Sequence, residues 1–169
     1  VLDSIGSGKT EGVFQLESGG MKNFMKELKP DCLEDIIAGV SLYRPGPMDQ
    51  IPRYIANKKD PEHAVYTHPA LKPILEVTYG CMVYQEQVMQ IVRDLAGYSL
   101  GRADLVRRAM GKKKLDVMAK EREVFINGQV DEEGNIIVPG CVRNGIDAKS
   151  ADKIFDEMAE FAKYAFNKS

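Results

Sequence analysis

The chain has 169 residues, of which 44% are hydrophobic, and this suits one globular domain with a buried core. Its formal net charge of -2 excludes a uniformly basic nucleic-acid-binding protein, so any basic surface must be local. Three cysteines without a Cys-x-x-Cys pair favour neither a disulfide framework nor a zinc ribbon, and we expect reduced thiols in a cytoplasmic protein. No apolar run approaches the roughly 18 residues of a membrane-spanning helix, so we expect no membrane partner.

The two ends of the sequence indicate a fragment of a longer protein. Val1 is not a methionine, no signal peptide follows it, and Ser169 comes directly after a strong helical pattern.

The first part of the chain predicts one strand and one helix. After a lead rich in glycine and serine, residues 13–16 have the composition of a strand. Ser18 is a typical N-cap for the helix that follows, and Pro30 marks its end. The helix has apolar residues at helical spacing, namely Met21, Phe24, Met25 and Leu28.

A second helix is predicted from Cys32 to Tyr43. Asp31 is a suitable N-cap, and Glu34, three residues later, completes a capping-box pattern. The apolar residues expected on one face are Leu33, Ile36, Ile37 and Val40. Arg44-Pro-Gly-Pro47 must end this helix, and four more prolines within residues 48–80 predict short helices joined by loops.

The rest of the chain predicts longer helices and one hairpin. The apolar stripe of the first helix is Val88, Ile91, Val92 and Leu95, and Gly97 closes it. A helix over about 101–110 is expected to bury Ala103, Val106 and Met110 and to stop at Gly111. A third helix is expected over about 115–127, a small β-hairpin insert over 128–143, and a last amphipathic helix through Ala151, Ile154, Phe155, Met158, Phe161 and Ala162. The predicted class is mainly α.

Several patterns of catalytic chemistry are absent from the sequence. Gly6-Ser-Gly-Lys-Thr10 resembles the end of a P-loop, but Asp3 stands where that motif needs its first glycine. His63 and His68 lie on different helical faces without a third ligand nearby, which disfavours a metal site. No Asp-x-Asp pair occurs, so we expect no metal-holding catalytic centre in this chain.

Residues 102–114 carry six basic residues and one acidic residue. Arg107 and Arg108 lie about 100° apart on a helix, so both can point away from its buried face. Two guanidinium groups beside a cluster of lysines suit a polyphosphate or a nucleic-acid backbone. The alternative is a solvated basic surface that pairs with acidic residues elsewhere.

Six sequence blocks, in this order, resemble the alpha-subunit family of bacterial DNA polymerase III, the C-family replicative polymerases. They are Glu11-Gly-Val-Phe-Gln-Leu-Glu-Ser18, Tyr43-Arg-Pro-Gly-Pro-Met48, Tyr84-Gln-Glu-Gln-Val-Met89, Gly97-Tyr-Ser-Leu-Gly-Arg-Ala-Asp104, Arg107-Arg-Ala-Met-Gly-Lys-Lys113 and Phe161-Ala-Lys-Tyr-Ala-Phe-Asn-Lys-Ser169. The resemblance covers nearly the whole chain. It implies a multi-helix fingers domain over 19–169, preceded by a palm–fingers connection over 1–18.

The resemblance also implies roles for individual residues. The residues expected at the incoming nucleotide and nascent base pair are Arg107, Arg108, Arg44, Tyr164, Asn167, Lys168 and Ser169. The residues expected at the DNA backbone are Arg102, Lys112, Lys113 and Lys114. The family's catalytic aspartates, which bind Mg²⁺, would lie outside this chain, so we expect the chain alone to be inactive.

The partners implied by the resemblance are template-primer DNA, deoxynucleoside triphosphates, and the palm and thumb of the same polypeptide. A sliding clamp, a proofreading exonuclease and clamp-loader subunits would contact the parent enzyme outside this chain. The alternative function is a helical nucleic-acid-binding module without enzymatic activity. A P-loop hydrolase would rest on Gly8-Lys-Thr10 alone.

Overall fold

A computed structural model of the chain describes residues 1–112 and 115–162. Most of them lie in helices, and the strands form one two-stranded sheet, so the predicted mainly α class is confirmed. Contacts divide the chain into two compact units, Val1–Ala64 and Val65–Ser169. The predicted functional boundary after residue 18 stays a prediction. No helix within the described ranges is long and apolar enough to cross a membrane.

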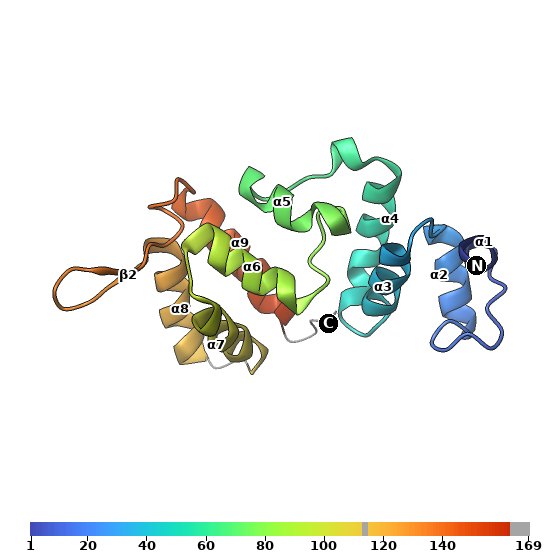
Figure 1. Cartoon of the computed structure of the whole chain (residues 1–169), viewed down its shortest axis with the longest axis horizontal. Helices are drawn as coiled ribbons and strands as arrows, with labels where there is room; N and C mark the ends of the chain where they lie inside the picture. The colour runs from blue at the N-terminus through green and yellow to red at the C-terminus, as the bar shows by residue number, and fades with distance from the viewer. Residues whose placement is uncertain (113–114, 163–169) are drawn as a thin grey trace. The chain divides into compact units, whose positions relative to one another are not determined.

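The first unit consists of short helices (Figure 1). They are α1 (Leu2–Gly6), α2 (Gly19–Leu28), α3 (Leu33–Leu42) and α4 (Ile51–Lys59), with 3-10 helices η1 (Pro47–Gln50) and η2 (Pro61–His63). The Ser18 hydroxyl accepts a hydrogen bond from the backbone N–H of Met21 at 3.2 Å, which confirms the predicted N-cap of α2. The helix ends at Lys29, which has a left-handed backbone with φ of 49°, directly before Pro30.

The strand predicted over residues 13–16 is wrong, because this segment forms two consecutive turns. The N–H of Val13 donates to the carbonyl of Thr10, and the N–H of Leu16 donates to that of Val13. Gln15 has a φ of 67°, which a strand cannot accommodate. The buried Thr10 hydroxyl donates to the Leu16 carbonyl, so the hydroxyl that a P-loop would use for its ligand is occupied.

The predicted N-cap of α3 is also wrong. Cys32 occupies the N-cap position without a side-chain hydrogen bond, so neither Asp31 nor Glu34 forms the expected capping box. Instead, the carboxylate of Asp35 accepts the N–H of Asp31 at 3.1 Å. Asp35, in the first turn of α3, therefore binds the backbone of the residue that precedes the N-cap.

The buried face of α3 differs from the predicted apolar stripe. It contains Asp35, Ala38, Gly39, Ser41 and Leu42, whereas Leu33 is exposed and Ile36, Ile37 and Val40 are half-buried. Asp35 can be buried because the ammonium group of Lys58 lies 2.9 Å from its carboxylate. The inner face of α3 thus includes a paired charge and is offset from the stripe of its apolar residues.

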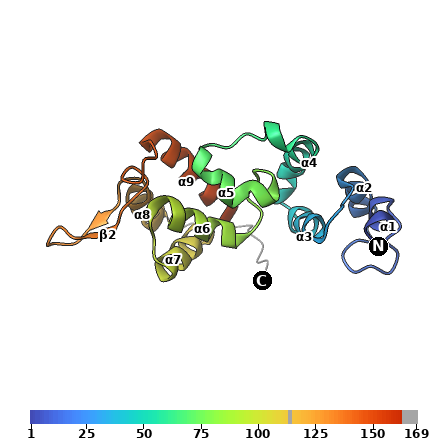
Figure 2. The same ribbon diagram turned by 45° about the horizontal axis from the view of Figure 1, so that its top comes forward.

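The second unit contains the longer helices (Figures 1 and 2). Its helices are the short α5 (Lys72–Leu75) and the longer α6 (Gln85–Ala96), α7 (Leu100–Gly111), α8 (Leu115–Asn127) and α9 (Ala148–Ala162), with 3-10 helices η3 (Pro69–Leu71) and η4 (Glu76–Thr78). Gly97 ends α6 with a φ of 79°, as predicted. Gly111 is the last residue of α7 rather than the stop beyond it, and Lys112 is the C-cap.

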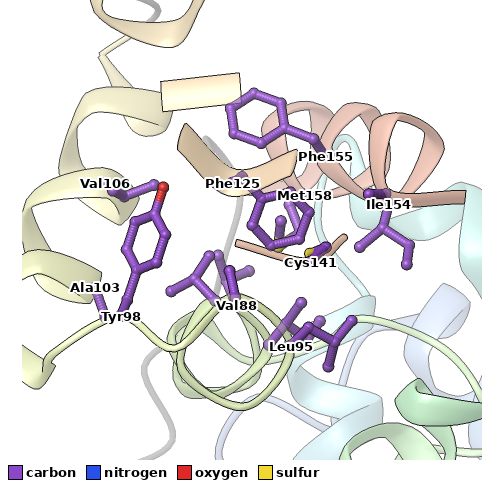
Figure 3. Packing of buried hydrophobic residues seen from close by; sticks show 14 of the residues in the cluster. Val88, Leu95, Tyr98, Ala103, Val106, Phe125, Cys141, Ile154, Phe155 and Met158 are labelled. Carbon is purple, nitrogen blue, oxygen red and sulfur yellow. The ribbon is translucent and has the colours of Figure 1, made fainter. Parts of the chain in front are cut away.

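One core holds this unit together. α7 and α8 both contact α9, and α6 contacts all three. Figure 3 shows side chains of these helices, together with Tyr98 and Cys141, converging on the core. Phe125 and Phe155 have ring centroids 5.8 Å apart. The predicted stripes of α6, α7 and α9 supply much of this core, so the periodicity of these helices identified their buried faces.

The predicted hairpin consists of β1 (Gln129–Val130) and β2 (Ile136–Val138), paired antiparallel. It extends away from the helices in both views (Figures 1 and 2). Its base is attached to the core, because the N–H of Gly140 donates to Ala96 and that of Cys141 donates to Phe125. The side chain of Asn144 also donates to the carbonyl of Leu95 at 2.8 Å.

Candidate phosphate-binding site

The two predicted phosphate-binding arginines lie on α7 around one carboxylate. Asp104 precedes Arg107 by three residues and Arg108 by four, and this spacing places the three side chains on one side of the helix. One oxygen of Asp104 accepts from Arg107 Nη2 at 2.8 Å and Nε at 3.3 Å, and the other lies 2.8 Å from Arg108 Nη2. One carboxylate for two guanidinium groups leaves this cluster with a net positive charge.

The ionised state of Asp104 is favoured by both arginines. The hydrogen bond from Arg107, together with the charges of Arg108 and Arg107, holds the pKa of Asp104 below its ordinary value of 3.8. The exposure of the two arginines differs, since 62% of the Arg108 side chain is accessible but only 23% of Arg107. Arg108 therefore faces solvent, while Arg107 is held partly against the protein.

A second contact to Arg107 comes from a different helix. The side-chain oxygen of Gln85, the first residue of α6, accepts from Arg107 Nη1 at 2.8 Å. Asp104 and Gln85 thus bind different nitrogens of the same guanidinium group. The plane of this group is fixed between α6 and α7.

Arg102, a predicted DNA-backbone residue, is engaged within the fold. Its Nη2 donates to Glu121 of α8 at 3.1 Å, and its guanidinium carbon lies 5.3 Å from the centroid of the Tyr98 ring. The Tyr98 hydroxyl donates to the same Glu121 carboxylate at 3.1 Å. Burial, together with the negative charge of Glu121, raises the pKa of Tyr98. This group of three side chains ties α7 to α8.

An open hollow of about 420 Å³ adjoins Arg108. Its lining residues are Leu105, Val106, Arg108, Ala109, Lys112, Val117 and Glu121. Leu105 and Val117 are exposed apolar residues, and Lys112 is an exposed lysine at the end of α7. The hollow thus combines apolar walls with two basic residues, Arg108 and Lys112, and one acidic residue, Glu121.

The remaining predicted site residues belong to the first unit or lie outside the described residues. Arg44 belongs to the first unit, where it is exposed on the turn that follows α3. Gly46, two residues later, has a φ of 97°, which explains the glycine between the two prolines of this turn. Lys113, Lys114, Tyr164, Asn167, Lys168 and Ser169 lie outside the described residues.

One group of potential metal ligands occurs in the described part of the chain, at Asp31, Cys32 and Asp35. Lys58 places its ammonium nitrogen 2.9 Å from Asp35 and 3.6 Å from Asp31. Mg²⁺ requires an octahedral shell of oxygen ligands, so a thiol and an ammonium group do not fit it. We assign no metal to these residues.

The sequence matches the family model described as "Bacterial DNA polymerase III alpha subunit finger domain" over residues 1–133. The chain belongs to this family. The resemblance based on the six sequence blocks is therefore confirmed, and the matched residues include helices α1 to α8 and the first strand of the hairpin.

Curated relatives agree with this assignment. Proteins named DNA polymerase III subunit alpha are 52% identical in Xylella fastidiosa over 99% of this chain and 48% identical in Halalkalibacterium halodurans over 98%. The corresponding protein of Chlamydia muridarum is 53% identical over 96% of the chain. The chain spans only 12% to 14% of the length of these relatives.

The sequence alone did not identify three polar residues of the site, Asp104, Gln85 and Glu121. The spacing of Asp104 from the two arginines was a usable signal, because residues three and four apart on a helix are neighbours. Gln85 and Glu121 lie 22 and 19 residues from their arginine partners, so no local pattern connects them.

Proposed function

We propose that the chain acts as the fingers region of a full-length DNA polymerase III alpha subunit, in which Arg107 and Arg108 bind the triphosphate of the incoming nucleotide. The observation that carries this proposal is the pair of guanidinium groups around the single carboxylate of Asp104 in a chain of the fingers family. One of the two, Arg108, also lines an open hollow. Guanidinium groups bind phosphate oxygens through planar, two-pronged hydrogen bonds.

The proposed reaction is nucleotidyl transfer, in which a primer hydroxyl attacks the α-phosphate and pyrophosphate leaves. Negative charge develops on the leaving phosphates, so positive groups aimed at them lower the barrier. Arg107 and Arg108 would neutralise this charge and hold the β- and γ-phosphates in line. Mg²⁺, bound by carboxylates outside this chain, would polarise the phosphoryl oxygens.

DNA contacts are proposed for the basic end of α7. Lys112 is exposed there, and Lys113 and Lys114 follow it in the sequence. Three ammonium groups suit the sequence-independent binding of a phosphate backbone. For Arg102 we propose mainly a supporting role, because its contacts to Glu121 and Tyr98 hold α7 on α8.

The remaining roles follow the family resemblance. We propose Arg44 at the active cleft, and Tyr164, Asn167, Lys168 and Ser169 at the nascent base pair. The sliding clamp, proofreading exonuclease and clamp loader would contact other parts of the subunit, and the site of action would be the cytoplasm.

Replacing each arginine in the full-length subunit tests the central proposal. A hydrogen bond to a charged group contributes about 1.5–3 kcal/mol, so Arg107→Ala and Arg108→Ala should each lower kcat/KM about ten- to a hundredfold. All four nucleotides should be affected alike, because their triphosphates are identical. Lysine should rescue only in part, since it keeps the charge but loses the planar fork. Arg93→Ala, which removes an exposed arginine of α6, is the matched control.

DNA affinity, measured in the same variants, separates the alternatives. The nucleotide assignment predicts lower kcat/KM with nearly unchanged DNA affinity. Unchanged nucleotide kinetics with a salt-dependent loss of DNA affinity would show that the arginines grip the DNA backbone instead. That result would favour a nucleic-acid-binding role for this surface.

A further inference from the structure

The contact between Gln85 and Arg107 joins the start of α6 to the middle of α7. Three of the five N–H groups of an arginine are engaged here, two by Asp104 and one by Gln85. Both contacts of Asp104 go to a single carboxylate oxygen, Oδ1. The guanidinium group could still swing about this one atom. The oxygen of Gln85, 2.8 Å from Nη1 on the other side of the group, prevents this rotation.

The charge of the second acceptor matters as much as its position. Asp104 already neutralises part of the charge of Arg107 and Arg108. A second carboxylate would cancel the net positive charge of the cluster and repel a triphosphate. An amide oxygen instead fixes the group while the charge stays available to an anion.

We propose that Gln85 is a positioning residue for Arg107, holding its guanidinium plane ready for the phosphates of the incoming nucleotide. This role rests on the proposed function, since it requires that Arg107 binds the triphosphate. Among the described residues, two N–H groups of Arg107 remain without a hydrogen bond. The side chain of Arg107 is 23% accessible, so the guanidinium group is not sealed off from solvent. A preorganised donor avoids the cost of ordering a flexible side chain during the reaction.

The test uses Gln85→Ala in the full-length alpha subunit, with steady-state kinetics for each nucleotide. We expect kcat/KM to fall about tenfold for all four nucleotides. A loss of this size is typical when a residue that orients a metal ligand is removed, and Gln85 orients Arg107 in the same way. Gln90→Ala is the matched control, because Gln90 is an exposed glutamine of the same helix whose side chain donates to the nearby Asp94. It should leave kcat/KM unchanged, and both variants should melt within a few degrees of the parent.

A double-mutant cycle shows whether Gln85 acts through Arg107. In an Arg107→Ala background, Gln85→Ala should cause no further loss, because its partner is gone. Additive losses, or a Gln85→Ala variant with normal kinetics, would overturn the positioning role. If Arg107→Ala itself had no effect on nucleotide use, the proposed function would fail first, so the two failures are distinguishable.

Gln85→Glu separates orientation from charge. It keeps an acceptor of the same reach but adds a negative charge, so KM should rise at low ionic strength. This rise should shrink as salt screens the added charge, whereas the defect of Gln85→Ala should persist. Equal salt dependence of the two variants would contradict the proposal.

Discussion

Lys58 connects three helices of the first unit through one ammonium group. It lies on α4, donates to the carbonyls of Leu28 and Lys29 at the end of α2, and pairs with the Asp35 carboxylate of α3 at 2.9 Å. The Asp35 side chain is 1% exposed and that of Lys58 is 12% exposed. Lys58→Met keeps the length of the side chain but leaves a buried carboxylate without its counter-ion.

The loss of stability expected for Lys58→Met follows from the burial of this ion pair. Removing one partner of a buried ion pair costs about 3–5 kcal/mol, because the remaining charge cannot reach water. The weaker contact to Asp31 contributes little, since that side chain is 78% exposed. A loss of about 3 kcal/mol or more is a large part of the stability of a small domain.

The stability that Asp35 contributes depends on pH in a direction that follows from its pKa. Burial opposes the charge of Asp35, but hydrogen bonds with Asp31 and Lys58 outweigh burial and place its pKa below the ordinary value of 3.8. Its contribution to stability is therefore present above that value and is lost as the pH falls through the folded pKa. Removing Lys58 takes away part of what lowers this pKa and leaves the burial in place, so we expect the pKa of Asp35 to be higher in the variant than in the parent. The variant should then regain stability relative to the parent as the pH falls from 7 towards 4.

Amide hydrogen exchange on the chain measures this effect locally. Peptides from α2, α3 and α4 should lose protection in Lys58→Met, whereas those from α6 to α9 serve as an internal reference. Lys59→Met, which changes the exposed neighbour, should stay within about 0.5 kcal/mol of the parent. Unaltered protection in Lys58→Met, or a deficit that grows on acidification, would refute this account of Asp35.

Two further predictions concern the thiols and one glycine. In the native chain at pH 8, a maleimide should label the exposed Cys32, whereas Cys141 should react only after unfolding, because burial raises its pKa to about 12. Mass spectrometry of peptides measures the labelling, and rapid labelling of Cys141 in the native chain would contradict its burial. Gly97→Ala should lower the melting temperature by an amount corresponding to about 1–3 kcal/mol, because φ is 79° and a Cβ would lie 2.7 Å from Pro139. Gly101→Ala, where a Cβ meets no atom within 4 Å, should leave the melting temperature unchanged or raise it. An equal loss of melting temperature in both variants would show that the positive φ of Gly97 does not cause the effect.

The helices of the second unit could be predicted from sequence because several signals agree there. The stripe of α6 has helical spacing and ends at a glycine with positive φ, and α7 begins at Ser99, whose hydroxyl accepts from the N–H of Arg102. Propensity, capping and burial all favour the same boundaries. The apolar periodicity then identifies which residues enter the core.

The first unit was harder to predict from sequence, because the contacts that determine its structure are polar or depend on backbone conformation. The apolar pattern of α3 could not show that Asp35 is buried, since this depends on Lys58, a residue 23 positions later in the sequence. The composition of residues 13–16 favoured a strand, yet Phe14 is 86% exposed and the chain turns at Gln15. Tertiary context overrides such local β propensity.

The candidate site was predictable in its charge but not in its geometry. The basic run on α7 identified Arg107 and Arg108 as a pair, and their spacing follows from helical periodicity. Periodicity did not show that Arg107 is much less exposed than Arg108. The partner of Arg107 on α6 became visible only in the folded chain. Long-range hydrogen bonds between polar side chains leave no periodic trace in a sequence.

The attachment of the hairpin has a consequence for how this domain can vary. Its base is fastened to the ends of α6 and α8, whereas the turn at Asp131–Asn135 contacts mainly itself. Lengthening such a turn costs little, because loop-closure entropy grows only by about 0.6 kcal/mol for each doubling. The tip is thus a permissive position, at which evolution or an engineer can insert a segment while the helical scaffold and the arginine pair on α7 keep their places.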